Sequence, residues 1–141
     1  MVSFTIEIEP IGKGRPRLGR GGARTPEKTR VWCAAFAMMA RQYRPAEVLR
    51  GPLRVDIDAV FTRPSRLHRK ADPDGLIWKD TRPDKDNVEK AVLDALSEFW
   101  VDDAQAVCGE TRKFYAERDG VPRVSVRITC AGAPVGLVGG E

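Results

Sequence analysis

Six apolar residues between positions 88 and 99 recur at the spacing of one face of an α-helix. Asp86 stands just before them as a natural N-cap, and Glu89 is placed to complete a capping box. The spacing therefore predicts a helix over about 87–99 with one buried face. The six positions are Val88, Ala91, Val92, Ala95, Leu96 and Phe99.

Three other segments alternate apolar and polar residues, as half-buried strands do. They cover residues 2–9, 53–61 and 123–130, and a further strand is expected over about 105–115. Between 63 and 83 runs a long polar loop, which is uncommon inside a compact domain and is often functional or disordered.

A first helix is expected to begin at Thr25-Pro26, an N-cap followed by proline at the first helical position, and to stop before Pro45. Its apolar stripe is expected to contain Val31, Ala34, Ala35, Met38 and Met39, reaching Tyr43.

The resulting order β, α, β, α, β, β predicts an α+β domain, in which two helices pack on a small mixed sheet. Residues 1–130 are expected to form this domain, and residues 131–141, rich in Gly, Ala and Pro, a flexible C-terminal tail.

Cysteine and histidine are too few to build a familiar zinc site. The three cysteines are far apart and read as small buried apolar residues, and the single histidine excludes a HExxH motif within one chain. A bound metal would need carboxylate ligands, which favour Mg2+ or Mn2+. The sequence has neither a signal peptide nor an apolar run long enough to span a membrane, so we expect a cytoplasmic protein.

Charge is distributed unevenly along the chain. Two basic stretches lie at 13–24 and 63–70, whereas acids gather between 72 and 103. Basic loops around an acidic centre suit a phosphodiester substrate, although ordinary solvated surface is the alternative. The basic residues are Lys13, Arg15, Arg17, Arg20 and Arg24 in the first stretch, and Arg63, Arg66, Arg69 and Lys70 in the second.

The acids that fit a catalytic site flank the second helix. Asp84 and Asp86 approach its N-terminus, and Lys90 follows Asp86 by four residues, so it can reach back toward them. Asp102 and Asp103 come after the helix and return to its start only if the next strand packs antiparallel beneath it. Magnesium held by two to four carboxylates activates water and stabilises phosphate charge, and a nearby lysine assists.

A structural role is the alternative for the same residues. Asp84 and Asp86 could cap the helix, Lys90 could form an ion pair at i,i+4, and Asp102-Asp103 could be a polar loop. A second Asp-x-Asp at Asp56 and Asp58 is interpreted as the solvated face of a strand.

The combined pattern resembles the RusA family of Holliday-junction resolvases. The segment 82–96, beginning Arg-Pro-Asp-Lys-Asp-Asn, and the segment 101–107, Val-Asp-Asp-Ala-Gln-Ala-Val, are similar to the family's two hallmark motifs. The segment 10–17, Pro-Ile-Gly-Lys-Gly-Arg-Pro-Arg, is similar to its basic motif. The resemblance spans about residues 4–130.

This resemblance implies a homodimeric, Mg2+-dependent endonuclease of bacteria or phages, with Mn2+ able to substitute, that resolves four-way DNA junctions by paired symmetric nicks. A two-fold dimer would present two identical sites to a nearly symmetric junction. Carried over by motif position, the metal ligands are Asp84, Asp86 and Asp103 with Asp102 as neighbour, and Lys90 is the catalytic lysine. The residues expected to bind DNA are Lys13, Arg15, Arg17, Arg20, Arg69, Lys70 and Trp78.

Trp78 has two interpretations, because the family's aromatic wedge before the first aspartate is replaced here by Arg82-Pro83. It could insert between bases, or it could anchor its own loop. Trp32 and Trp100 are expected in the core or in a dimer interface. The alternative functions are a non-catalytic protein that binds branched DNA, or a nuclease acting mainly on flaps or forks.

Overall fold

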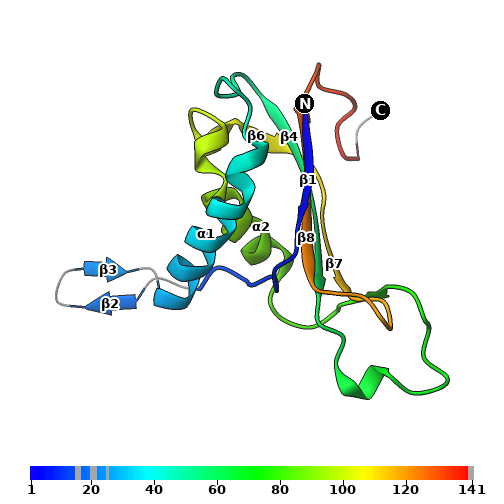
Figure 1. Ribbon diagram of the computed structural model, residues 1–141. Coiled ribbons are helices and arrows are strands. Elements are labelled where there is room, and N and C mark those ends of the chain that lie inside the picture. Colours follow the sequence, from blue (N-terminus) through cyan, green and yellow to red (C-terminus); the bar gives the residue numbers. More distant parts are fainter. Residues whose placement is uncertain (15–16, 20–21, 25, 140–141) are drawn as a thin grey trace.

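Two helices cover one face of a six-stranded mixed sheet, whose strands run in the order β1-β8-β4-β7-β5, with β6 paired to β4 (Figure 1). The computed structural model describes residues 1–14, 17–19, 22–24 and 26–139; of residues 15–25 it describes no side chains. The expected α+β class, with two helices on a mixed sheet, is confirmed. The elements are β1 (Val2–Ile6), β2 (Arg17–Gly19), β3 (Gly22–Arg24), α1 (Glu27–Ala40), β4 (Leu53–Phe61), β5 (Ile77–Trp78), α2 (Lys85–Ala95), β6 (Ala106–Cys108), β7 (Thr111–Tyr115) and β8 (Arg123–Cys130), with short 3-10 helices η1 (Arg41–Tyr43), η2 (Ser65–Leu67), η3 (Ser97–Phe99) and η4 (Asp103–Gln105).

Strand β4 organises the sheet, since it pairs antiparallel with β8 and parallel with both β6 and β7. The single strand expected over 105–115 is therefore two strands. They are separated at Gly109, which has φ of 132° and lies so close to β4 that a Cβ would collide with the carbonyl oxygen of Val55. Only glycine tolerates both the positive φ and this close approach.

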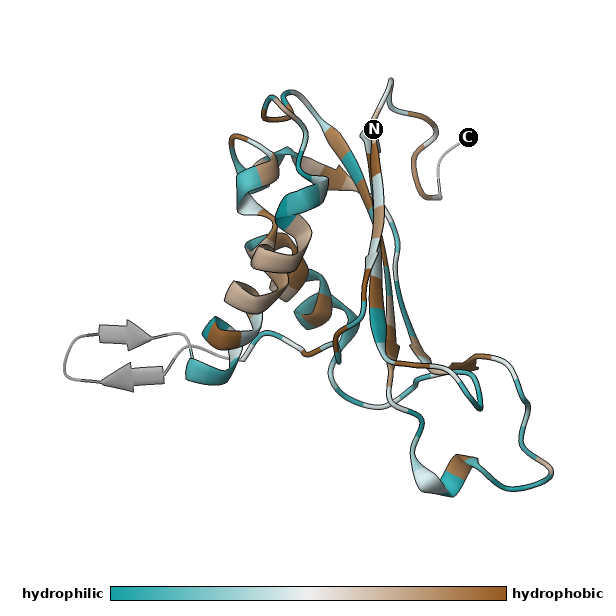
Figure 2. Cartoon of the chain, viewed as in Figure 1, coloured by the Kyte–Doolittle hydropathy of each residue, from teal (hydrophilic) through white to brown (hydrophobic). Residues whose placement is uncertain are grey.

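The second helix has the predicted buried face. All six of its predicted positions are buried, from Val88 in α2 to Phe99 in η3. Five of them pack in one cluster with sheet residues such as Ile57 and Val126, whereas Val88 packs in a second cluster with Ala59. Figure 2 shows apolar residues along the helices and the strands that they cover. Burying each such large side chain stabilises the fold by about 1.5–3 kcal/mol.

The first helix buries a different face from the one expected. Val31 and Met38 are 62% and 72% exposed, whereas Trp32 and Phe36 are 7% and 0% exposed. The sequence of α1 is apolar almost all round, so spacing alone does not select a face. The aromatic rings decide it: Trp32 and Phe36 stack with centroids 5.0 Å apart, and Trp32 Nε1 donates to the carbonyl oxygen of Glu9 at 2.8 Å.

Other boundaries also differ from the expectations. The first strand ends at Ile6, and the N-cap of α2 is Asp84 instead of Asp86. Cys108 and Cys130 are exposed, since they are the last residues of β6 and β8. The expected N-cap Thr25 lies outside the described residues. No helix in the described part of the chain is both long and apolar enough to be a membrane span.

Candidate active site

The two motif aspartates lie at the N-terminus of α2 with their carboxylates exposed. Asp84 is the N-cap by its backbone, since its carbonyl oxygen accepts from the N–H of Val88 at 3.1 Å, but its side chain makes no capping hydrogen bond. Asp86 follows in the first turn, and its side chain is 68% exposed. Both carboxylates are therefore free to bind a ligand at the positive end of a helix dipole.

Lys90 lies one turn further along α2 and reaches back toward Asp86. Its Nζ is 3.8 Å from Asp86 Oδ2, and its side chain is 60% exposed. An exposed i,i+4 pair of this kind contributes little to stability, about 0.3–0.5 kcal/mol. Lys90 can therefore move toward a phosphate without a large cost.

Strand β7 supports the loop that carries Asp84. Lys113 Nζ donates to the carbonyl oxygens of Thr81 at 2.7 Å and Pro83 at 2.6 Å. Burial and the nearby charge of Lys79 lower the pKa of Lys113, while Asp84 acts in the opposite direction. Nothing in the sequence indicated this role, because Lys113 belongs to no motif and reaches Asp84 only through the sheet.

The basic N-terminal segment begins against the same loop. A Cβ on Gly12 would collide with the ring of Pro83, and the N–H of Lys13 donates to the carbonyl oxygen of Asn87 at 2.9 Å. Lys13 Nζ pairs with Asp94 at 2.8 Å, and this hydrogen bond raises the pKa of Lys13. Lys13 is thus held along α2, while the side chains of Arg15, Arg17 and Arg20 lie outside the described residues.

The second pair of aspartates lies beyond the other end of α2. The Asp102 side chain caps η4, accepting from the N–H of Ala104 at 2.8 Å within a capping box that includes Gln105. Asp103 Oδ1 accepts from Trp100 Nε1 at 2.6 Å. Both aspartates are exposed, and the buried Trp100 fixes the direction of one of them.

Two lengths show how far apart the acidic pairs lie within one chain. Helix α2 has 11 residues, which span about 16 Å at 1.5 Å per residue. In the sheet, Ala106, which follows the second acidic pair, is paired with Leu53, and Lys113, which supports the loop before Asp84, is paired with Ala59. Leu53 and Ala59 are about 20 Å apart along β4. Carboxylates that share one Mg2+ each lie about 2.0–2.1 Å from it.

One chain therefore does not bring the four aspartates to one ion. Among the residues described, no three acidic, histidine or cysteine side chains come close enough to hold a metal together. Asp84 and Asp86 by themselves suit Mg2+, which is usually bound by one or two carboxylates together with water and substrate phosphates. Asp102 and Asp103 precede β6 and β7, the strands that run back along α2, so within the described chain they lie toward the other end of the helix.

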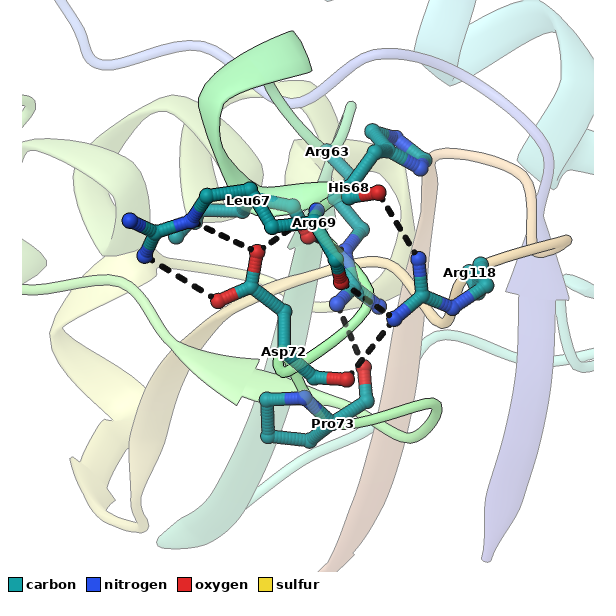
Figure 3. A network of polar contacts seen from close by, with 7 residues as sticks. All are labelled: Arg63, Leu67, His68, Arg69, Asp72, Pro73 and Arg118. Atoms are coloured by element: carbon teal, nitrogen blue, oxygen red, sulfur yellow. Dashed lines mark hydrogen bonds and ion pairs between the residues drawn. The ribbon is translucent and has the colours of Figure 1, made fainter.

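The loop between β4 and β5 is organised by two arginines (Figure 3). Arg63 is 5% exposed and donates to the carbonyl oxygens of Leu67 and Pro73. Arg118 donates to main-chain oxygens of His68, Arg69 and Asp72. The loop therefore has a defined conformation without a hydrophobic core of its own.

The DNA-binding candidates of this region are exposed to solvent, and Arg69 and Trp78 contact different neighbours. Arg69 forms an ion pair with Asp72 at 3.2 Å, with its side chain 74% exposed, and Lys70 is exposed beside it. Trp78 is 65% exposed and stacks on Phe114 with centroids 4.7 Å apart. One face of Trp78 is thus supported by the sheet.

Asp56 and Asp58 lie on the sheet face that the helices leave open. Arg54 and Arg127 pair with Asp56, and Arg112 pairs with Asp58 at 2.7 Å. Burial would raise the pKa of the Asp56 carboxyl, but the hydrogen bonds from Arg54 and from the Glu110 N–H hold the pKa below its usual value. These acids are neutralised by arginines and are not part of the site at α2.

Comparison with known proteins identifies a family for the chain. The family described as "Endodeoxyribonuclease RusA" matches residues 7–129, which include both acidic pairs and Lys90. The chain is also 34% identical over 137 residues to "Uncharacterized protein YqaN" of Bacillus subtilis (strain 168), covering 90% of this chain and 94% of that protein. With a match over most of its length, this chain belongs to the RusA family of Holliday-junction endodeoxyribonucleases.

Proposed function

We propose that this protein resolves four-way DNA junctions by paired symmetric nicks, using Mg2+ held by carboxylates, with Mn2+ able to substitute. The observation that carries the proposal is the pair Asp84 and Asp86, exposed and unused for capping at the N-terminus of α2, in a segment that resembles the family's acidic motif. The nuclease domain would be residues 1–130, working as a homodimer in the cytoplasm of a bacterium or a phage-infected cell.

The residues at α2 would have different roles in the reaction. Asp84 and Asp86 would hold the ion together with water and substrate phosphate, and Asp103 with its neighbour Asp102 would complete the set only in the assembled homodimer. When bound, the ion would supply an acidified water and neutralise charge on the phosphate. Lys90, exposed and one turn away, would approach the scissile phosphate and stabilise the charge that develops there.

The DNA backbone would be held by basic side chains on both sides of the acids. Lys13 is close to α2, and the segment that follows it carries the other cations of the first basic stretch. The loop organised by Arg63 and Arg118 carries the remaining cations, Arg69 and Lys70. The proposed DNA contacts are Lys13, Arg15, Arg17, Arg20, Arg69, Lys70 and Trp78.

The test compares a labelled four-way junction with a flap, a fork and a linear duplex, each with Mg2+ and with EDTA. Paired nicks on the junction that require Mg2+ are expected. Asp86→Asn should abolish cutting and keep junction binding, and Asp119→Asn, in an exposed turn, should cut normally.

Junction binding without cutting in Mg2+ or Mn2+ would replace the proposal with a branched-DNA-binding protein. Preferential cutting of flaps or forks would change the substrate. Undiminished cutting by both Asp84→Asn and Asp86→Asn would overturn the site.

A further inference from the structure

We infer that Lys79 and Arg66 bind a backbone phosphate of the DNA strand that is cut, beside the scissile phosphate at Asp84. The inference rests on the proposed function, since it adds a second contact to the same strand at the same site. Its starting point is a cluster of three cations around the hydroxyl group of Tyr115 and the segment that leads into α2. The cluster consists of Arg66, Lys79 and Lys113.

Two hydroxyl groups and two aromatic rings position these side chains. Lys79 Nζ donates to Thr81 Oγ1 at 2.8 Å, and Arg66 Nη2 donates to the hydroxyl oxygen of Tyr115 at 3.3 Å. The two hydroxyl groups share a hydrogen bond of 2.9 Å. Lys79 Nζ also lies 4.8 Å from the ring centroid of Tyr115 and 4.9 Å from that of Phe61, within the range of cation–π contacts. Both cations are therefore held in place before a ligand binds.

Among the described residues, no carboxylate forms an ion pair with this cluster. Arg66, Lys79 and Lys113 have none within the ion-pair distance, whereas arginines of the neighbouring loop pair with aspartates. Burial lowers the pKa of Lys113 and the charge of Lys79 lowers it further, against the opposite effect of Asp84 and Asp80. The two ammonium groups therefore repel each other, and an anion bound between them would offset this repulsion.

The remaining donors suit a phosphate. An ammonium and a guanidinium group carry more N–H groups than the hydroxyl oxygens of Thr81 and Tyr115 accept, so Lys79 and Arg66 keep donors for a ligand. A guanidinium matches two phosphate oxygens in its geometry, and a lysine supplies a point charge. Because Arg66 is exposed and Lys79 is half-buried, a backbone phosphate reaches them from solvent.

The cluster lies on the face of the sheet that α2 covers. On β7, Thr111 donates to Glu89 of α2 at 2.9 Å, and Tyr115 lies on the same side of the strand because side chains alternate. Thr81 precedes Asp84 by three residues, which span at most about 11 Å. Successive phosphates of one DNA strand are about 3.4 Å apart along the helix axis. A strand with its scissile phosphate at Asp84 therefore brings another phosphate, a few nucleotides away, within reach of the cluster.

Neutral phosphates distinguish this binding site from a purely structural cluster. A four-way junction is prepared with a methylphosphonate, which lacks the negative charge, at one position after another around the crossover. Junction binding is measured in EDTA, so that neither cutting nor a metal ion contributes. The loss of affinity at each position is compared between wild type and Lys79→Met, which keeps most of the side-chain volume.

We expect at least one position where the methylphosphonate weakens wild-type binding by about tenfold, the scale of a hydrogen bond to a charged group. The same change should have little effect on Lys79→Met, because the contact is already lost, and Lys79→Arg should restore the effect. Lys79→Met, Arg66→Gln and the double variant should each reduce the slope of log K against log salt concentration by about 0.9, since they share one phosphate.

Arg127→Gln is the matched control, because it removes an exposed partner of Asp56 from the opposite face of the sheet. It should respond to every methylphosphonate as wild type does. A Lys79→Met variant that responds as wild type does at every position would overturn the inference. If this variant also has a lower urea midpoint, the cluster has a structural role alone.

The two proposals fail in different ways. Junctions that are bound with the expected methylphosphonate pattern but remain uncut in Mg2+ would overturn the proposed function and keep the phosphate site. Paired cutting by wild type with no difference between wild type and Lys79→Met in the methylphosphonate series would overturn the phosphate site and keep the proposed function.

Discussion

Lys113 Nζ donates to the carbonyl oxygen of Pro83 at 2.6 Å, so a side chain of the sheet holds the residue that precedes the first motif aspartate. The same ammonium group donates to the carbonyl oxygen of Thr81. The position of Asp84 therefore depends on β7 as well as on α2.

Replacing Lys113 by Met should remove this support while keeping most of the side-chain volume. We expect the free energy of unfolding to fall by about 1.5–3 kcal/mol, the usual contribution of hydrogen bonds to a charged group. Junction cutting should fall by up to about 100-fold, because small displacements of catalytic groups are costly. Urea denaturation and single-turnover cutting measure the two effects, with the exposed Lys28→Met as control. Normal cutting by a destabilised variant would show that Lys113 serves stability alone.

The hydrogen-bonded Asp56 should make stability depend on pH. Its pKa is lowered in the folded protein, so its contribution is present above the unfolded pKa and is lost as pH falls through the folded value. Asp56→Asn should therefore have a lower urea midpoint than wild type at pH 7, and the difference should shrink at about pH 3. Asp119→Asn provides the comparison. An unchanged difference at the two pH values would contradict the role of the Asp56 charge.

The two faces of α1 should respond differently to truncation. Phe36→Ala should cost about 3–5 kcal/mol of stability, because it leaves a cavity in the core. Met38→Ala, on the exposed face, should change the free energy of unfolding by less than about 0.5 kcal/mol. Urea denaturation distinguishes the two, and a larger loss for Met38→Ala would mean that this face is covered in solution.

Replacing Trp78 by Ala should reduce the unstacking of bases in the bound junction. A junction with 2-aminopurine at its centre is expected to brighten on binding wild-type protein and to brighten less with Trp78→Ala. Loss of one stacked base corresponds to about 1–3 kcal/mol of binding free energy. Trp78→Phe should retain part of the signal. If Trp78→Ala lowers the urea midpoint and leaves the fluorescence unchanged, Trp78 is an anchor of its loop.

The basic stretch should determine much of the salt dependence of junction binding. Each phosphate contact contributes about 0.9 to the slope of log K against log salt concentration. Replacing Arg15, Arg17 and Arg20 by Ala should therefore reduce the slope by up to about 2.7. Arg41→Ala and Arg44→Ala, which remove exposed partners of Glu98, serve as controls and should leave it unchanged. Equal slopes for wild type and the triple variant would remove these arginines from the interface.

Much of the fold could be predicted because several segments have only one plausible apolar face. The helical spacing from Val88 to Phe99 and the alternation along β4 each define a buried side, and both were confirmed. Helix α1 was different. Its apolar residues surround the helix, so the buried face depends on how Trp32 and Phe36 stack, which is a property of the folded core.

The candidate site was less predictable because its parts meet through the sheet. Sequence motifs identified Asp84, Asp86 and Lys90, which lie close together along one helix. They could not place Asp103, whose position depends on the turn of the chain at Trp100 and the pairing of Ala106 with Leu53. They also gave no indication of Lys113, since only the pairing of β4 with β7 brings it to Pro83.

The length of β4 between Leu53 and Ala59 also sets the spacing of the two ends of α2 on the sheet. Ala106, which follows the second acidic pair, is paired with Leu53, and Lys113, which supports the loop before Asp84, is paired with Ala59, about 20 Å away along the strand. With one base pair for about every 3.4 Å of duplex axis, this distance corresponds to about six base pairs. Because one strand connects both ends, each residue inserted into or deleted from this part of β4 would change their spacing by about 3.3 Å.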